Sequence, residues 1–187
     1  MLIFFDTEFT SLHPKSKLIS IGLIATDGRE FYAEMTDTYM KSHCSEWVKD
    51  NVLPLLDAPE SQRMTRDEMA VQLRVWIESF GRPVMLACDS LACDWRWIKK
   101  LFQKQKKWPT NLFREPEILK FTFDEVFVEA VADAFKQGLR RHHALDDAKA
   151  NHFGWQTCMN VSLADSTIEP SDTALHFIML DVTLNIK

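Results

Sequence analysis

The stretch "RRHHALDDAKA", from Arg140 to Ala150, places two adjacent histidines and two adjacent aspartates at the start of a predicted helix. His142, Ala144 and Asp147 form the pattern H-x-A-x-x-D, which chance supplies in about one or two chains per hundred of this length. The spacing predicts Asp147 in the first helical turn and His142 just before it. Aspartates commonly stabilise a helix N-terminus, but a histidine at this offset is unusual. The pattern therefore indicates a candidate site.

Two further acidic groups follow predicted buried strands. Asp6 and Glu8 end the apolar run "LIFFDTEF" of residues 2–9, and their i, i+2 spacing puts both side chains on one face of a strand. Asp94 follows the strand "PVMLACDS" of residues 83–90 where a helix begins; a helix N-cap is the alternative role, and Asp89 is a competitor. Ligand sites of α/β sheets gather at the carboxyl ends of strands. The position of Asp6 and Glu8 favours a ligand site, and ordinary acidic residues after a strand are the alternative, since chance supplies a D-x-E triplet in about half of chains this long.

The rest of the chain predicts a mixed α/β order. Residues 17–35, "KLISIGLIATDGREFYAEM", indicate two strands joined by a hairpin at Asp27-Gly28. Helices are predicted over 45–56 (disrupted near Pro54), 65–80 (with a capping box from Thr65 to Glu68), 94–108, 127–135 and 144–155, the last closed by Gly154. The packing face of the predicted helix over 94–108 should consist of Trp97, Ile98, Leu101 and Phe102. The alternating residues 180–187, "LDVTLNIK", predict a half-buried strand.

Composition favours one soluble domain of 187 residues. With 46% hydrophobic residues and a net charge of −5, the chain is unlike a protein that coats nucleic acid with a basic surface. Its four cysteines form no CxxC pair, which favours free thiols in a reducing compartment. The N-terminus lacks the basic region of a signal peptide, and no apolar run reaches the length of a membrane span. A cytoplasmic location is expected.

Together these residues resemble the DEDDh 3′-5′ exonucleases, which include RNase T, oligoribonuclease and the proofreading exonucleases. The similarity covers about residues 2–155, followed by an extension over about 156–187. "HHALDDAKA" resembles the family's H-R-A-L-D-D-A, and "DSLACDWRWI" resembles the oligoribonuclease second motif, which selects Asp94 over Asp89. Two positions differ from the family: Ser11 stands where a glycine is frequent, and His143 replaces the arginine.

The resemblance implies an RNase H-like fold, with a mixed five-stranded sheet, its first three strands antiparallel and helices on both faces. It also implies two Mg²⁺ or Mn²⁺ ions, which prefer carboxylate oxygens. Asp6 would bridge both ions, Glu8 and Asp147 would hold the water-activating ion, and Asp94 would act on the second. His142 would be the general base, for which its ordinary pKa is suited.

Six residues are candidates for substrate binding. Phe9, Thr10 and Leu12 directly follow the first motif, as in relatives whose loop contacts the terminal nucleotide; a core role for Phe9 or Leu12 is the alternative. The basic face of residues 96–107, including Arg96 and Lys99, is either an ordinary solvated helix face or a guide for the substrate backbone, and Arg141 could serve likewise. Thr7 is interpreted as a strand filler.

The expected function is a metal-dependent 3′-5′ exonuclease that acts on single-stranded 3′ ends and releases nucleoside 5′-monophosphates, with RNA slightly preferred. A single-stranded DNA exonuclease and a non-catalytic nucleic-acid-binding module on the same fold are the alternatives. A homodimer that pairs through the edge of residues 180–186 is also predicted, against completion of the chain's own sheet by that strand. Of the two histidines, His142 should face the ions, leaving His143 exposed or in contact with the substrate backbone.

Overall fold

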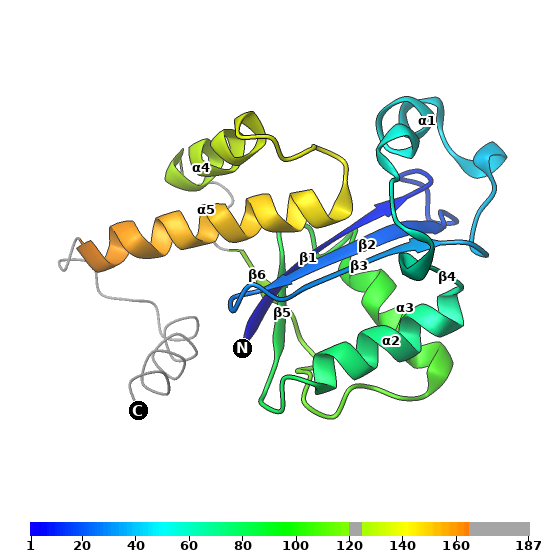
Figure 1. The fold of residues 1–187 in the computed structure, drawn as a ribbon, viewed down its shortest axis with the longest axis horizontal. Helices are drawn as coiled ribbons and strands as arrows, with labels where there is room; N and C mark the ends of the chain where they lie inside the picture. The colour runs from blue at the N-terminus through cyan, green and yellow to red at the C-terminus, as the bar shows by residue number, and fades with distance from the viewer. Residues whose placement is uncertain (120–124, 165–187) are drawn as a thin grey trace.

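A mixed six-stranded sheet in the order β4-β3-β2-β1-β5-β6 forms the centre of the computed structural model, which describes residues 1–119 and 125–164 (Figure 1). The strands are β1 (Leu2–Phe9), β2 (Leu18–Ala25), β3 (Glu30–Met35), β4 (Arg63–Met64), β5 (Met85–Cys88) and β6 (Glu117–Ile118). The first three strands are antiparallel neighbours, as predicted, while β5 lies parallel to β1, β6 to β5 and β4 to β3. The prediction of five strands is wrong, because β4 and β6 have two residues each and are too short to carry an alternating pattern.

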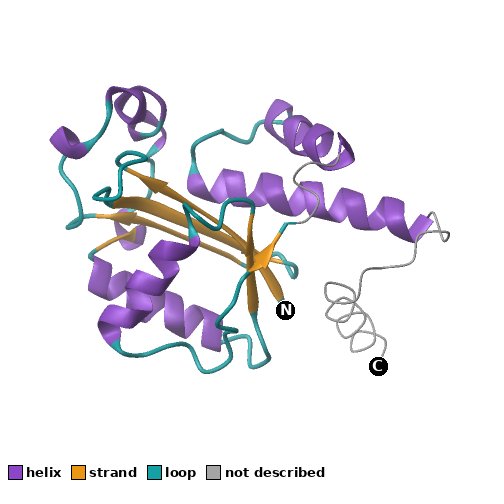
Figure 2. Cartoon of the chain, turned by 180° about the vertical axis from the view of Figure 1, so that it is seen from behind, coloured by secondary structure: helices purple, strands orange, loops and turns teal. Residues whose placement is uncertain are grey.

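Helices cover both faces of the sheet, as predicted (Figures 1 and 2). The α-helices within the described residues are α1 (Glu46–Asn51), α2 (Arg66–Glu78), α3 (Trp95–Gln105), α4 (Glu125–Lys136) and α5 (Ala144–Ala164), and short 3-10 turns span Lys41–His43, Leu53–Leu55 and Glu60–Gln62. α2 and α3 pack on one face, and α5 packs on the other with α4 on its outer side. The predicted capping box is present, since Thr65 and Glu68 close it at the start of α2.

The alternation of β1 decides where its acidic residues lie. Ile3 and Phe5 belong to the large core beneath α2 and α3, whereas Phe4 packs in the smaller core beneath α5. Because side chains alternate along a strand, Asp6 and Glu8 share the face of Phe4. Both carboxylates therefore lie on the side of the sheet that the first turn of α5 covers.

Gly154 does not close the last helix, which continues to Ala164. A Cβ at this position would lie 2.8 Å from Val131 Cγ2 and 2.9 Å from the Phe127 ring, both on α4. Glycine here lets two helices approach closely, so the inference that it ends the helix is wrong. The sequence pattern of a C-terminal glycine and that of a helix-contact glycine are alike.

Two predictions concern residues outside the described ranges. The strand predicted over residues 180–187 lies there, and the homodimer that would use it stays a prediction. The four cysteines are free thiols; Cys44, Cys88 and Cys158 are buried, whereas Cys93 is partly exposed. Among the described helices, none combines the length and apolar character that a membrane span requires.

Candidate active site

A cleft of about 830 Å³ opens where the carboxyl ends of β1 and β5 meet the start of α5. Its lining includes all five side chains of the predicted site and one more carboxylate: Asp6, Glu8, Asp89, Asp94, His142 and Asp147. These residues come from three separate parts of the chain. The strand order explains why these residues meet. β5, which precedes Asp89 and Asp94, pairs directly with β1, and α5, which carries Asp147, packs on β1.

The ligand atoms in the cleft form two groups of three. Oxygens of Glu8 and Asp147 and a ring nitrogen of His142 all lie within 4.8 Å of one another. Carboxylate oxygens of Asp6, Asp89 and Asp94 form the second group within the same limit. Asp89 and Asp94, which the sequence offered as competing candidates, therefore both lie at the site.

Asp94 is fixed by a hydrogen bond across the sheet and not by a capping role. Thr7 Oγ1 donates to Asp94 Oδ1 at 2.5 Å, and both side chains are buried. Asp94 does stand at the N-cap position of α3, as the alternative expected, but its side chain makes no cap hydrogen bond there. The interpretation of Thr7 as a strand filler is wrong, because its hydroxyl, on the opposite face of β1 from Asp6, orients a carboxylate of the site.

The carboxylates repel one another strongly. Burial first, and then the charges of Asp94, Asp147, Glu8 and Asp89, hold the pKa of Asp6 well above its ordinary value. Burial and the neighbouring carboxylates raise the pKa of Glu8 to about 8. Burial also raises the pKa of Asp94 and of Asp147 to about 7. Such a cluster is stabilised by positive charge, so the site has the electrostatic character of a cation-binding centre.

His142 adopts a left-handed backbone conformation at the entrance to α5, with φ of 67°. Its backbone N–H donates to Asp147 Oδ2 at 2.7 Å, and its ring meets that of Trp47 edge-on at 4.7 Å between centroids. Histidine tolerates this backbone region better than most residues. Burial, and then the charge of Arg141, lower the pKa of the imidazole, which keeps the ring neutral and able to accept a proton near neutral pH.

Comparison with protein families matches residues 1–159 to the 3′-5′ exoribonuclease Rv2179c-like domain. That region contains every residue of the two ligand groups. The chain belongs to this family.

Two curated relatives of this exoribonuclease-family domain come from Mycobacterium tuberculosis. They are 3′-5′ exoribonuclease Rv2179c of strain ATCC 25618 / H37Rv and 3′-5′ exoribonuclease MT2234.1 of strain CDC 1551 / Oshkosh. Each is 38% identical to this chain over 98 residues, which are 52% of this chain and 54% of the relative. The similarity therefore spans about half the length of the curated relatives.

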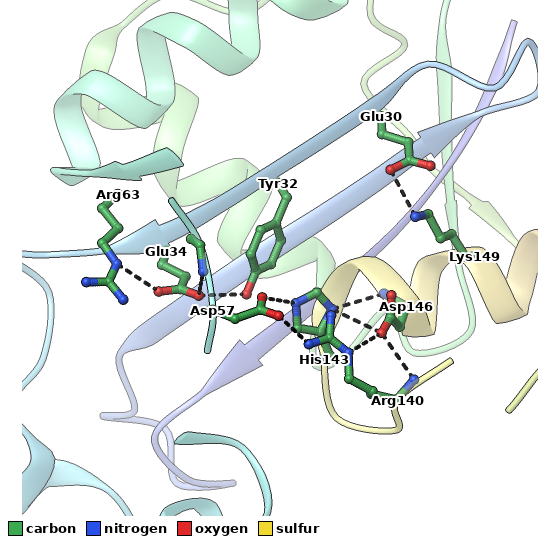
Figure 3. Close-up of polar contacts among 10 residues, drawn as sticks. Glu30, Tyr32, Glu34, Asp57, Arg63, Arg140, His143, Asp146 and Lys149 are labelled. Carbon is green, nitrogen blue, oxygen red and sulfur yellow. Dashed lines mark hydrogen bonds and ion pairs between the residues drawn. The ribbon is translucent and has the colours of Figure 1, made fainter. Parts of the chain in front are cut away.

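His143 does not line the cleft, and its ring lies in a polar network with Arg140, Asp57 and Asp146 (Figure 3). Only 2% of this residue is exposed, and its ring packs on Tyr32 at 4.6 Å between centroids. Its ring nitrogens lie 3.5 Å from an Asp57 oxygen and 3.6 Å from an Asp146 oxygen. Arg140 links the same two carboxylates through contacts of 2.6 Å to Asp57 and 2.7 Å to Asp146. The expectation of an exposed His143 is wrong, since the loop turns neighbouring side chains in opposite directions.

The candidate substrate-binding residues divide into two sets. Phe9, Leu12 and Arg141 line the cleft, and Leu12, with 85% of its surface exposed, is no core residue. Thr10 is buried and its hydroxyl accepts the Lys17 N–H at 3.0 Å, which stabilises the loop after β1. Arg96 packs over the Phe9 ring beside the cleft, and Lys99 is exposed on α3.

Sequence reasoning did not identify two residues that shape the cleft. Trp47 lines the cleft from α1, and 51% of its surface is exposed. A large aromatic residue in a short predicted helix was the sequence feature that could have indicated it. Gly22 lies in β2, where a Cβ would overlap the backbone of Ala144 and Leu145 at the start of α5. Glycine inside an otherwise apolar strand often marks such a close approach.

Proposed function

We propose that the chain is a metal-dependent 3′-5′ exoribonuclease that hydrolyses single-stranded RNA to nucleoside 5′-monophosphates, with a DEDDh site on an RNase H-like fold. The observation that carries this proposal is the convergence of Asp6, Glu8, Asp94, His142 and Asp147 in one cleft. The family description and the names of the relatives favour RNA over DNA as substrate.

The donor set of the cleft fits two Mg²⁺ or Mn²⁺ ions. Hard divalent cations prefer carboxylate oxygens, and the cleft offers two groups of ligand atoms, each within 4.8 Å. Bound divalent ions supply Lewis acidity that activates water and offsets the charge of the leaving oxygen. The mutual repulsion of the carboxylates supports this fit, because cations would relieve it.

The two groups suggest how the carboxylates divide. Glu8 and Asp147 would hold one ion, and Asp94, with Asp89 beside it, would hold the second. Asp6 would serve both, and its pKa supports this role, since the other four carboxylates of the cleft all raise it.

His142 would accept the proton of the attacking water. Its ring nitrogen lies within 4.8 Å of the oxygens of Glu8 and Asp147, which places a neutral base beside one ligand group. The hydrogen bond from its own N–H to Asp147 couples the position of the base to that of a ligand. Geometry and protonation state thus agree with a general base.

Apolar side chains at the mouth of the cleft would receive the terminal nucleotides. Leu12 and Trp47 are largely exposed there. Phe9 also lines the cleft and is the residue between Glu8 and the loop that follows β1. Aromatic rings provide sequence-tolerant stacking surfaces for bases. Ser11 also lines the cleft. Its side chain would occupy space beside the substrate strand that the glycine frequent in the family leaves open.

The test uses matched 5′-labelled RNA and DNA oligomers with Mg²⁺, with Mn²⁺ or with EDTA. We expect the RNA to shorten stepwise from its 3′ end with either metal and to stay intact in EDTA. Digestion in EDTA or purely internal cleavage would contradict the proposal. Faster digestion of DNA than of RNA would show that DNA is the preferred substrate.

Asp6→Asn should abolish this turnover, because it removes a shared ligand without changing the size of the side chain. Asp133→Asn is the matched control, since it makes the same change at an exposed residue of α4 that pairs with Lys136. Near-normal turnover of Asp6→Asn would show that the acidic cluster is not catalytic.

A further inference from the structure

Four basic side chains gather next to the cleft on the face of the sheet that carries α2 and α3. Lys17 comes from the connection between β1 and β2, Arg66 is the first residue of α2, and Arg96 and Lys100 lie one turn apart on α3. Burial and then the charges of Arg96, Arg66 and Lys17 lower the pKa of Lys100, in keeping with the position of these three side chains around it. We name these four residues the basic cluster.

Aromatic and polar contacts hold the basic cluster in place. Arg96 and Lys100 both pack over the Trp97 ring, at 4.7 Å and 4.5 Å from its centroid. Arg96 Nη2 also donates to Ser16 Oγ at 2.9 Å, and Arg66 Nη2 donates to the Lys100 carbonyl at 2.9 Å. These contact partners are neutral, so they do not compensate the positive charges, although the charge of Arg96 also acts on Asp94.

None of the four forms an ion pair with a carboxylate in residues 1–119 and 125–164. Two acidic residues lie near Arg66 at the start of α2. Asp67 pairs with Lys104, and Asp37 accepts the backbone N–H of Arg66, so neither forms an ion pair with the guanidinium. In a chain with a net charge of −5, unpaired cations concentrated at one place point to an anionic ligand.

Phe9 connects the basic cluster to the cleft. It follows Glu8 directly, lines the cleft and carries the guanidinium of Arg96 over its ring at 5.1 Å. Arg96 in turn lies two residues after Asp94. A strand whose 3′ end occupies the cleft therefore has the basic cluster as its neighbour on the side of α3.

We propose that the basic cluster binds the phosphate backbone of the single-stranded nucleic acid upstream of the nucleotide in the cleft. This proposal rests on the proposed function and adds the path of the substrate. It assigns the substrate contact to Lys17, Arg66, Arg96 and Lys100. Lys104, which is ion-paired, and Lys106 and Lys107, which follow the end of α3, lie outside it.

The test measures binding of a fluorescent 20-nucleotide RNA to the full chain in EDTA over a range of salt concentrations. For single strands, the slope of log K against log salt changes by about 0.7 for each phosphate contact. We expect Arg96→Gln/Lys100→Gln to reduce the slope by about 1.4, which is on the order of 25-fold weaker binding at 0.1 M salt. Lys106→Gln/Lys107→Gln removes the same charge from the same basic run and should leave the slope unchanged.

An equal change in both double variants would overturn the proposal, since it would show a general charge effect. A normal slope in Arg96→Gln/Lys100→Gln would overturn it as well. If that variant does not fold, Lys17→Gln/Arg66→Gln tests the other half of the basic cluster, with the same expected change.

A second measurement separates this proposal from the proposed function. With Mg²⁺, kcat/KM of Arg96→Gln/Lys100→Gln should fall more for the 20-nucleotide RNA than for a dinucleotide, which has one phosphodiester to bind. If the unaltered chain hydrolyses neither RNA, the proposed function fails, while the binding measurement in EDTA still decides the basic cluster.

Discussion

His142 and His143 are neighbours that the loop before α5 directs to opposite sides. His142 lines the cleft beside Glu8 and Asp147, whereas His143 is buried against Tyr32. The identical residue type in the two positions allows a direct comparison of the catalytic role that we propose for His142 with the structural role of His143.

We expect His142→Ala to lower the rate of RNA hydrolysis by about 10²–10⁴-fold, because that is the usual cost of losing a general base. The variant should fold normally and lose the acidic limb of its pH-rate profile. Since burial lowers the pKa of His142, that limb in the unaltered enzyme should lie below the ordinary histidine pKa. An unchanged pH profile in His142→Ala would assign the base to another residue.

His143→Ala should act on stability instead. It removes a buried ring from the network of Arg140, Asp57 and Asp146, and losses of this kind cost about 1–3 kcal/mol. Chemical denaturation of His142→Ala and His143→Ala, compared with the unaltered chain, measures the difference. A larger stability loss for His142→Ala would contradict the assignment of the two roles.

Thr7 gives a further prediction at the residue scale. Thr7→Val removes the hydrogen bond to Asp94 and keeps the shape of the side chain, so we expect about 10–100-fold lower activity at limiting Mg²⁺. Saturating Mg²⁺ should restore much of the activity, and Thr7→Ser should retain it throughout. Equal activity of Thr7→Val and Thr7→Ser across a Mg²⁺ titration would show that the hydroxyl does not orient Asp94.

At the scale of elements, the contact between β2 and the start of α5 positions Asp147. Gly22→Ala would drive a Cβ into the backbone of Ala144 and Leu145, so α5 must move away from the sheet. We expect a stability loss of about 2–3 kcal/mol or more together with a loss of activity, because overpacking displaces the helix that carries a ligand. Denaturation curves and RNA hydrolysis measure the two effects.

Gly28→Ala is the control for this prediction. Gly28 has φ of 88° in the hairpin turn and nothing within 4 Å of an added Cβ, so the change costs only backbone strain of about 1–2 kcal/mol. Activity should therefore survive in Gly28→Ala. Similar losses of activity in both variants would mean that the approach of α5 to Gly22 does not set the site.

Elements with a strong local pattern could be predicted from the sequence. The capping box of Thr65 and the apolar face of α3 depend on spacing within one helix, and both are present. The two-residue strands β4 and β6, the course of α5 past Gly154 and the burial of His143 depend on contacts between distant segments. Tertiary packing decides such features, and a single sequence does not display it.

At the scale of the whole molecule, the candidate site combines segments that are more than 140 residues apart in the chain. Sequence spacing selected its residues, but only the pairing of β5 with β1 explains why Asp94 and Asp89 both reach Asp6. The fold also concentrates negative charge in the cleft and positive charge in the basic cluster beside it. The raised pKa values of the clustered carboxylates make the stability of the protein without bound cations depend on pH.

The last prediction concerns that dependence. The raised pKa values, about 8 for Glu8 and about 7 for Asp94 and Asp147, mean that the folded protein without bound cations holds more protons than the unfolded chain between about pH 4 and about pH 8. Stability should therefore fall as pH rises from 5 to 8. If Mg²⁺ binds the ionised carboxylates as proposed, it should raise Tm at pH 8 and have little effect at pH 5. Thermal unfolding with and without Mg²⁺ measures both effects, and Glu8→Gln should show a smaller loss of stability between the two pH values. A loss in Glu8→Gln as large as that of the unaltered chain would show that Glu8 does not titrate in this range.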